Sequence, residues 1–185
     1  MKVFMIAVMS ADGFIARQSS EVSTAWTSAE DKKRLTRLTK RARAVVMGRK
    51  TFETFGSRPL KDRDLFIYSR QAGRGALDET STAGDASSGS VSWTQLPPRE
   101  LVLALAQRGY AELAVCGGAE VYSQFLAAGL VDELYLTIEP VLFGAGVSLA
   151  SQASEWRLEL LAHELTPGGT TFIDYRLIKA SPAPG

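Results

Sequence analysis

The stretch Val45-Val46-Met47-Gly48-Arg49-Lys50-Thr51-Phe52-Glu53 is a short apolar run that breaks at a glycine and continues into a basic, helix-compatible segment. Such a run predicts a buried strand that leads directly into a helix. Glycine lets the backbone approach a bulky ligand, and the first N–H groups of a helix have no partner inside it. With the cations of Arg49 and Lys50 and the hydroxyl of Thr51, this turn suits a phosphate or pyrophosphate. An ordinary surface turn is the alternative interpretation.

The same arrangement of strand, glycine and helix returns in residues 112–126, where Gly117 and Gly118 stand between an apolar run and a second helical segment. Two adjacent glycines let the main chain lie against a flat or charged group without an intervening side chain. The pattern is not Gly-x-Gly-x-x-Gly, so it does not indicate a standard dinucleotide-binding domain. Cys116 precedes the pair in an apolar strand, and we expect an inert core thiol there.

Composition excludes several classes of protein. The 185 residues are 45% hydrophobic, enough for one well-formed core, and 21 Lys and Arg against 20 Asp and Glu leave no bulk charge to attract nucleic acid. A single Cys and a single His exclude an intramolecular disulfide and a Cys/His metal cluster. Without an apolar span of about 18 residues or a secretory leader, we expect no membrane partner and a cytoplasmic location.

Apolar runs and breakers predict the remaining elements. Strands are expected at residues 2–9, 65–68, 91–93, 134–144, 156–165 and 170–178, and helices at about 27–41 and from Pro97 to Gly109. Residues 71–90 are rich in Gly, Ser and Thr, so we expect a mobile insertion there, and the Pro-rich residues 181–185 are expected to be disordered. His163 alternates with apolar neighbours in a late strand, with no acid nearby to make it catalytic.

This order predicts a single α/β domain over residues 1–180, with a mostly parallel central sheet, helices on both faces and an antiparallel strand pair at the C-terminus. Ligand sites in such sheets lie at the carboxyl ends of the strands. The turn at Gly48, the pair Ser69-Arg70 and the turn at Gly117 all fall at such ends. The sequence therefore predicts that three strand ends converge on one extended anionic molecule.

The chain resembles dihydrofolate reductase, in a superfamily that includes the pyrimidine reductase of riboflavin synthesis. The resemblance spans residues 2 to about 178 and rests on five motifs in order: Val45 to Glu53, Arg58-Pro59-Leu60 with Arg63, Ser69-Arg70, Cys116 to Tyr122, and Leu134-Tyr135-Leu136-Thr137. It implies hydride transfer from NADPH to C6 of 7,8-dihydrofolate with protonation at N5, which gives tetrahydrofolate.

The resemblance also implies which residues hold the cofactor. Gly48, Arg49, Lys50 and Thr51 match the loop that binds the cofactor phosphates, and Ser69 and Arg70 match the contact with the adenosine 2′-phosphate. The turn beside the nicotinamide and the pyrophosphate corresponds to Gly117, Gly118, Ala119, Glu120, Val121 and Tyr122, and family members have a cis peptide between the two glycines.

On the substrate side, the resemblance implies a carboxylate five residues after a tryptophan that binds the 2-amino group and N3 of the pterin. Counting from Trp26 gives Asp31, with Thr137 as its hydrogen-bonding supporter and Trp26 near the linking water. Glu30 is the competing acid, and both carboxylates also suit the first turn of a helix through its dipole. Ala7 and Leu35 are further expected substrate contacts.

Arg63 matches the arginine that pairs with the α-carboxylate of the glutamate in folate, a role that suits its planar fork, although it also fits an ordinary loop arginine. Residues 10–16 and 141–146 look more like the riboflavin-pathway side of the superfamily, and the expected lid over the nicotinamide, residues 17–25, has no apolar lid residue. A riboflavin-type pyrimidine reductase, another pterin reductase and a weakly active NADPH-binding homologue therefore stay open. Residues 141–147 suggest either a homodimer surface or a core strand.

Overall fold

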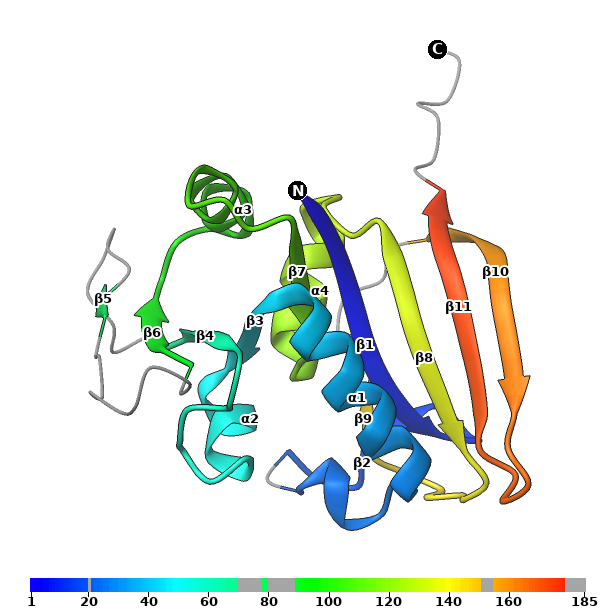
Figure 1. Ribbon diagram of the computed structural model, residues 1–185. Helices are drawn as coiled ribbons and strands as arrows, with labels where there is room; N and C mark the ends of the chain where they lie inside the picture. Colours follow the sequence, from blue (N-terminus) through cyan, green and yellow to red (C-terminus); the bar gives the residue numbers. More distant parts are fainter. Residues whose placement is uncertain (20, 70–77, 80–88, 151–154, 179–185) are drawn as a thin grey trace.

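The computed structural model describes residues 1–19, 21–69, 78–79, 89–150 and 155–178, and its centre is a nine-stranded sheet (Figure 1). In chain order the elements are β1 (Lys2–Ser10), β2 (Phe14–Ala16), a 3-10 turn (Ser23–Ala25), α1 (Ala29–Ala42), β3 (Arg43–Gly48), α2 (Arg49–Thr54), β4 (Asp64–Tyr68), β5 (Asp78–Glu79), β6 (Val91–Thr94), α3 (Pro98–Gln107), β7 (Glu112–Val115), α4 (Ala119–Ala127), β8 (Glu133–Glu139), β9 (Val147–Ser148), β10 (Arg157–Leu165) and β11 (Thr171–Ile178).

The strands follow the order β10-β11-β8-β1-β7-β3-β4-β6-β5 across the sheet. Neighbours from β8 to β6 run parallel, whereas β11 pairs antiparallel with both β8 and β10. The predicted fold class, a mostly parallel sheet with a C-terminal antiparallel pair, is confirmed. The parallel strands bring the ends of β1, β3, β4 and β7 to one edge of the sheet, which is where a ligand site is expected.

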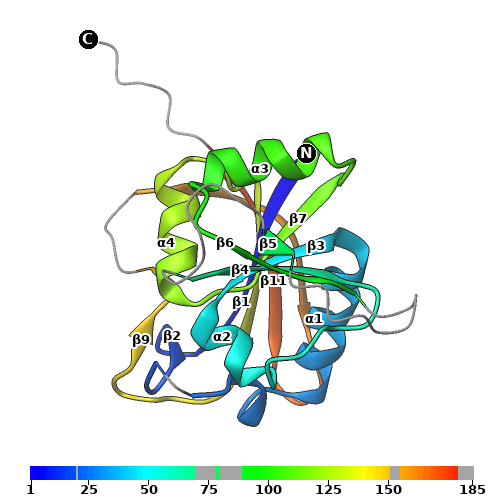
Figure 2. The ribbon, with the colours of Figure 1, turned by 90° about the vertical axis from the view of Figure 1, so that its left-hand side faces the viewer.

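Helices cover both faces of the sheet, so the central strands are buried on both sides (Figures 1 and 2). Val3, Met5 and Ala7 of β1 pack into the cluster that includes α3 and α4, and Phe4 and Ile6 pack into the cluster with α1 and α2. This explains why the sequence of β1 is almost continuously apolar rather than alternating. No helix among the described residues is both long and apolar enough to cross a bilayer.

Residues 141–146 differ from the sequence prediction, because they form a loop rather than a continuation of β8 or a core strand. Pro140 has no N–H to offer the sheet. The N–H groups of Phe143 and Gly144 instead donate to the carboxylate of Asp12, the shortest of these bonds being 2.7 Å. Leu142 is 76% exposed. The homodimer surface stays a prediction.

The expected insertion at residues 71–90 lies mostly outside the described residues, as does the tail 181–185. Within the insertion, β5 pairs antiparallel with β6 at the edge of the sheet. His163 lies in β10, an edge strand whose residues are all exposed. It is not among the residues that line the cavities described below.

Candidate active site

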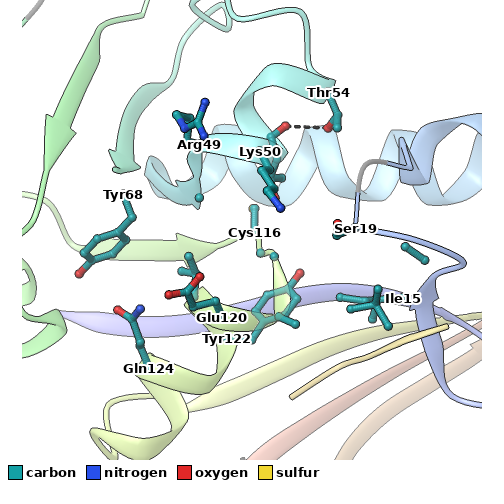
Figure 3. Close-up of a pocket in the computed structure, with 18 of the residues that line it drawn as sticks. Ile15, Ser19, Arg49, Lys50, Thr54, Tyr68, Cys116, Glu120, Tyr122 and Gln124 are labelled. Carbon is teal, nitrogen blue, oxygen red and sulfur yellow. Dashed lines mark hydrogen bonds between the residues drawn. The ribbon is translucent and has the colours of Figure 1, made fainter. Parts of the chain in front are cut away.

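A cavity of about 710 Å³ lies at the carboxyl ends of the parallel strands, between α2 and α4 (Figure 3). Gly48 from the end of β3, Ser69 from the end of β4 and Gly117 from the end of β7 all line it. The convergence of three strand ends that the sequence predicted is therefore present. Val8 of β1 and residues Ser19, Glu21 and Ser23, from the segment expected to act as a lid, complete its far side.

Two glycine turns form the floor of this cavity. The N–H of Gly48 donates to the carbonyl oxygen of Gly117 at 2.7 Å, which joins the two turns, and the peptide between Gly117 and Gly118 is cis. Gly117 has φ of +97°, and a Cβ there would lie 3.1 Å from the ring of Tyr122. Because Gly48, Gly117 and Gly118 have no side chains, the backbone itself faces the cavity at these positions.

The charged side chains around the cavity are of both signs. Lys50 reaches into it, while Nη1 of Arg49 is 2.8 Å from Oε1 of Glu53, its neighbour one turn later in α2 (Figure 3). Glu120 lies in the first turn of α4, where a carboxylate complements the helix dipole. The arrangement offers cations and the first N–H groups of α4 to phosphates, and the carboxylate of Glu120 to hydroxyl or amide donors, while the other lining carboxylate, Glu21, pairs with Arg17.

The structure brings nearly all the predicted cofactor residues together. Gly48, Arg49, Lys50, Thr51, Ser69 and the run Gly117 to Tyr122 line the cavity, and Arg70 lies outside the described residues. The sequence interpretation missed other lining residues, namely Thr54, Tyr68, Thr94, Gln95, Leu96, Pro97, Cys116 and Gln124. The rule of strand ends could have found the group after β6, and helical spacing from Glu120 could have found Gln124.

A second cavity of about 190 Å³ opens beside α1 and is lined by Leu35, Thr39 and Arg63 together with Thr24, Lys32, Thr36, Val45, Met47, Phe55, Leu60 and Cys116. The half-buried Arg63 donates from Nη1 to Oγ1 of Thr39 at 3.2 Å and from Nε to the carbonyl oxygen of Lys61 at 3.1 Å. Burial lowers the pKa of its guanidinium. Within the described ranges no carboxylate forms an ion pair with Arg63.

Cys116 packs against the core cluster that includes Phe4 and Met47, and it also lines both cavities, which the sequence did not predict. The side chain is half-buried at the end of β7, where the strand leaves the core and enters the glycine turn. Burial raises the pKa of its thiol to about 12, so the thiol is protonated near neutral pH. An apolar run alone could not predict that Cys116 lies between two cavities.

The predicted acid, Asp31, is buried in the first turn of α1. It is 5% exposed, and its N–H donates to Oγ of Ser28, the N-cap residue, at 3.1 Å. Its neighbour Glu30 is exposed. On β8, Thr137 is the register partner of Val8, which lines the large cavity. Ala7 is buried in the same part of β1.

Three buried polar atoms, two in the segment before α1 and one on β8, form no well-aligned hydrogen bond among the described residues: Nε1 of Trp26, Oγ1 of Thr27 and Oγ1 of Thr137. Buried polar groups are nearly always paired, so a cluster of unpaired ones indicates a site for a polar ligand. Phe143 packs edge-on against Trp26, with ring centroids 4.9 Å apart, and the guanidinium of Arg17 lies over the Phe143 ring, 4.0 Å from its centroid.

Burial raises the pKa of the Asp31 carboxyl, and this effect outweighs the lowering by the nearby hydroxyls of Thr137 and Thr27. The two hydroxyls lie close enough to act on the charge, although neither forms a well-aligned hydrogen bond with it. The structure thus holds a buried carboxyl with a raised proton affinity beside two hydroxyl groups that favour its charged form. Such a group can accept two donors from a ligand when ionised, or give up a proton.

Comparison with known proteins agrees with this geometry. Residues 1–172 match the RibD C-terminal domain family. The chain is similar to dihydrofolate reductase type A13 of Escherichia coli, with 34% identity over 158 residues, 81% of this chain and 84% of that protein.

Two solved structures share the fold at low sequence identity. A pyrimidine reductase-like protein from Corynebacterium diphtheriae superposes with a TM-score of 0.76 at 21% identity, over 97% of this chain and 92% of that one. Dihydrofolate reductase from Enterococcus faecalis, in complex with NADP(H) and RAB-propyl, gives a TM-score of 0.67 at 20% identity, over 96% and 97% of the two chains. The chain therefore belongs to the RibD C-terminal domain family of dihydrofolate-reductase-like reductases.

Proposed function

We propose that this protein reduces 7,8-dihydrofolate to tetrahydrofolate with NADPH. The observation that carries the proposal is the buried Asp31 carboxylate at the start of α1, whose charged form is favoured by the neighbouring hydroxyl of Thr137 on β8. A 2-aminopyrimidine edge presents two neighbouring donors, which match the two oxygens of a carboxylate. A relative that is 34% identical to this chain over 158 residues is named as a dihydrofolate reductase.

The residues of the large cavity fit an NADPH molecule. Its floor carries no Cβ at Gly48 or Gly117, so a flat ring or a pyrophosphate can contact the backbone directly. Lys50 and Arg49 supply cations, the first N–H groups of α4 supply donors, and Ser69 lines the same wall. When bound there, NADPH would supply the hydride.

On the substrate side, Asp31 would hold the 2-amino group and N3 of the pterin, and Thr137 would donate its hydroxyl to the carboxylate. Trp26 would hold the water through which a proton reaches N5. Burial raises the pKa of the Asp31 carboxyl, so this group binds a proton more readily than an exposed aspartate does, which suits a part in proton transfer. Arg63 and Leu35 of the smaller cavity would bind the remainder of folate, and the exposed Glu30 would take no part.

A pyrimidine reductase of riboflavin synthesis is the second candidate, favoured by the family to which residues 1–172 belong and by the Corynebacterium structure. Its substrate carries a ribose phosphate in place of the benzoyl-glutamate tail. Reduction of another pterin, or cofactor binding with weak activity, are further alternatives. Asp31 favours a pterin such as dihydrofolate over a uracil-type pyrimidine, because a 2-aminopyrimidine edge makes use of a buried carboxylate.

The test is the loss of NADPH absorbance with dihydrofolate as substrate, in the unmodified protein and in Asp31→Asn. We expect turnover that falls by about 10²- to 10⁴-fold in the variant while NADPH affinity is unchanged. Glu30→Gln is the matched control, since it removes the neighbouring exposed carboxylate, and it should retain full activity. Turnover of the pyrimidine ribosyl phosphate but not of dihydrofolate, or an unchanged rate in Asp31→Asn, would refute the proposal.

A further inference from the structure

Glu139, the last residue of β8, is a buried carboxylate that the proposed reaction does not use. It is 3% exposed. Its Oε1 accepts the backbone N–H of Ser28 at 2.7 Å, and its Oε2 accepts the hydroxyl of Thr170 at 2.7 Å. Across the described ranges, no Lys or Arg forms an ion pair with it. Burial of a carboxylate that is hydrogen-bonded to two uncharged donors costs free energy, so the position of Glu139 calls for an explanation.

The two hydrogen bonds lead directly to the candidate acid. Ser28 is the N-cap of α1, and its Oγ accepts the N–H of Asp31 at 3.1 Å. Glu139 is also two residues from Thr137 on β8, so the two side chains leave the strand on the same face. One carboxylate thus connects the helix that carries Asp31 to the strand that carries Thr137.

We infer that Glu139 is a positioning residue, which fixes the start of α1 against β8 and so holds Asp31 beside Thr137 for the substrate. This inference rests on the proposed role of Asp31. Positioning of this kind matters because a displacement of about 1 Å at a reacting group can cost on the order of 10²-fold in rate.

Charge adds a second, measurable link between the two carboxylates. Glu139 raises the pKa of Asp31, whereas Arg34, one turn further along α1, lowers it. Arg34 is itself paired with Asp174 of β11 and lies over the ring of Phe172. From α4, the buried phenol of Tyr122 also faces Asp31. Neutralising Glu139 removes a like charge and leaves these other groups in place, so the Asp31 carboxyl should give up its proton more readily.

Glu139→Gln separates charge from geometry. The amide oxygen of glutamine can still accept the Ser28 N–H, and the Thr170 hydroxyl can turn to accept from the amide N–H₂. In the substrate-free protein, we expect the NMR titration of the Asp31 carboxyl to move to lower pH. The pH profile of kcat/KM should move in the same direction. Glu159→Gln, which neutralises an exposed carboxylate of β10 paired with Arg176, is the control and should move neither.

Glu139→Ala removes both hydrogen bonds, the one from Ser28 and the one from Thr170. We expect kcat/KM for dihydrofolate to fall by about 10- to 100-fold while NADPH affinity is retained, because the cofactor cavity does not include this residue. If the alanine variant does not fold, Thr170→Val gives the second test, since it loosens Glu139 without deleting it and should lower kcat with unchanged NADPH binding.

An Asp31 titration that does not move in Glu139→Gln, or a fall in rate matched by an equal loss of NADPH binding in the truncated variant, would overturn the inference. The substrate-free titration requires no turnover. It therefore tests the coupling between Glu139 and Asp31 even if dihydrofolate proves not to be the substrate. A protein inactive on dihydrofolate whose Asp31 titration still moves would refute the proposed function and leave the coupling intact.

Discussion

Arg63 provides the sharpest test of which substrate tail the smaller cavity accepts. Arginine has five N–H donors, and in the structure Nη1 donates to Thr39 and Nε to the carbonyl oxygen of Lys61. The remaining donors are available for a carboxylate, and partial burial strengthens that interaction. Arg63→Met should therefore remove the recognition of a glutamate tail while its side chain still fills the wall of the cavity.

The magnitude follows from the hydrogen bonds that are lost. A hydrogen bond to a charged group contributes about 1.5–3 kcal/mol. The loss of one such bond corresponds to an increase of about 10- to 150-fold in KM for dihydrofolate. A dihydropterin without the benzoyl-glutamate tail makes no such contact, so its KM should not change. Arg99→Met is the matched control, because Arg99 is exposed on α3 and donates to the carbonyl oxygen of Ala128, away from the smaller cavity.

The assay is steady-state oxidation of NADPH with each of the two substrates, in the unmodified protein and in both variants. The reasoning predicts a loss in Arg63→Met that is confined to the substrate with the glutamate tail. An equal loss with both substrates would show that Arg63 supports the structure of the cavity instead. No loss with either would show that the tail does not bind there.

Two further outcomes are expected. Gly117→Ala should lower the free energy of unfolding by more than the control Gly109→Ala, measured by denaturant titration. Both sites have positive φ, which costs about 1–2 kcal/mol for alanine, but only at Gly117 would the new Cβ meet the Tyr122 ring. Only Gly117→Ala should also weaken NADPH binding. Asp31→Asn should stabilise the protein by about 1 kcal/mol at neutral pH. Because the folded-state pKa of Asp31 is raised, the unmodified protein loses stability as pH rises from the unfolded pKa through the folded one. The gain should therefore disappear in acid, and a gain that persists there would contradict this explanation.

Sequence patterns were sufficient where the structure is set by local signals. The continuous apolar run of β1 predicted a central strand, and the glycine turns after β3 and β7 predicted the floor of the large cavity. The ends of parallel strands share one edge of the sheet, so order along the chain was enough to bring Gly48, Ser69 and Gly117 together.

Features that depend on distant contacts could not be read in this way. Glu30 and Asp31 both suit the first turn of a helix, and only the packing of α1 against the sheet shows which of them is buried. The loop after β8 looked like a strand because its composition is apolar. Instead, the backbone N–H of Phe143 donates to the carboxylate of Asp12, which lies 131 residues away in the sequence.

The hydrogen bonds to Asp12 allow the opening of the loop at residues 141–146 to be followed at two individual backbone amides. Its carboxylate accepts the N–H groups of Phe143 and Gly144, and Phe143 in turn packs against Trp26 beside the candidate acid. Movement of the loop away from Trp26 must break these bonds. The rate at which these two amide hydrogens exchange with solvent deuterium therefore reports how often the loop opens. A ligand that contacts Trp26 should lower both exchange rates together.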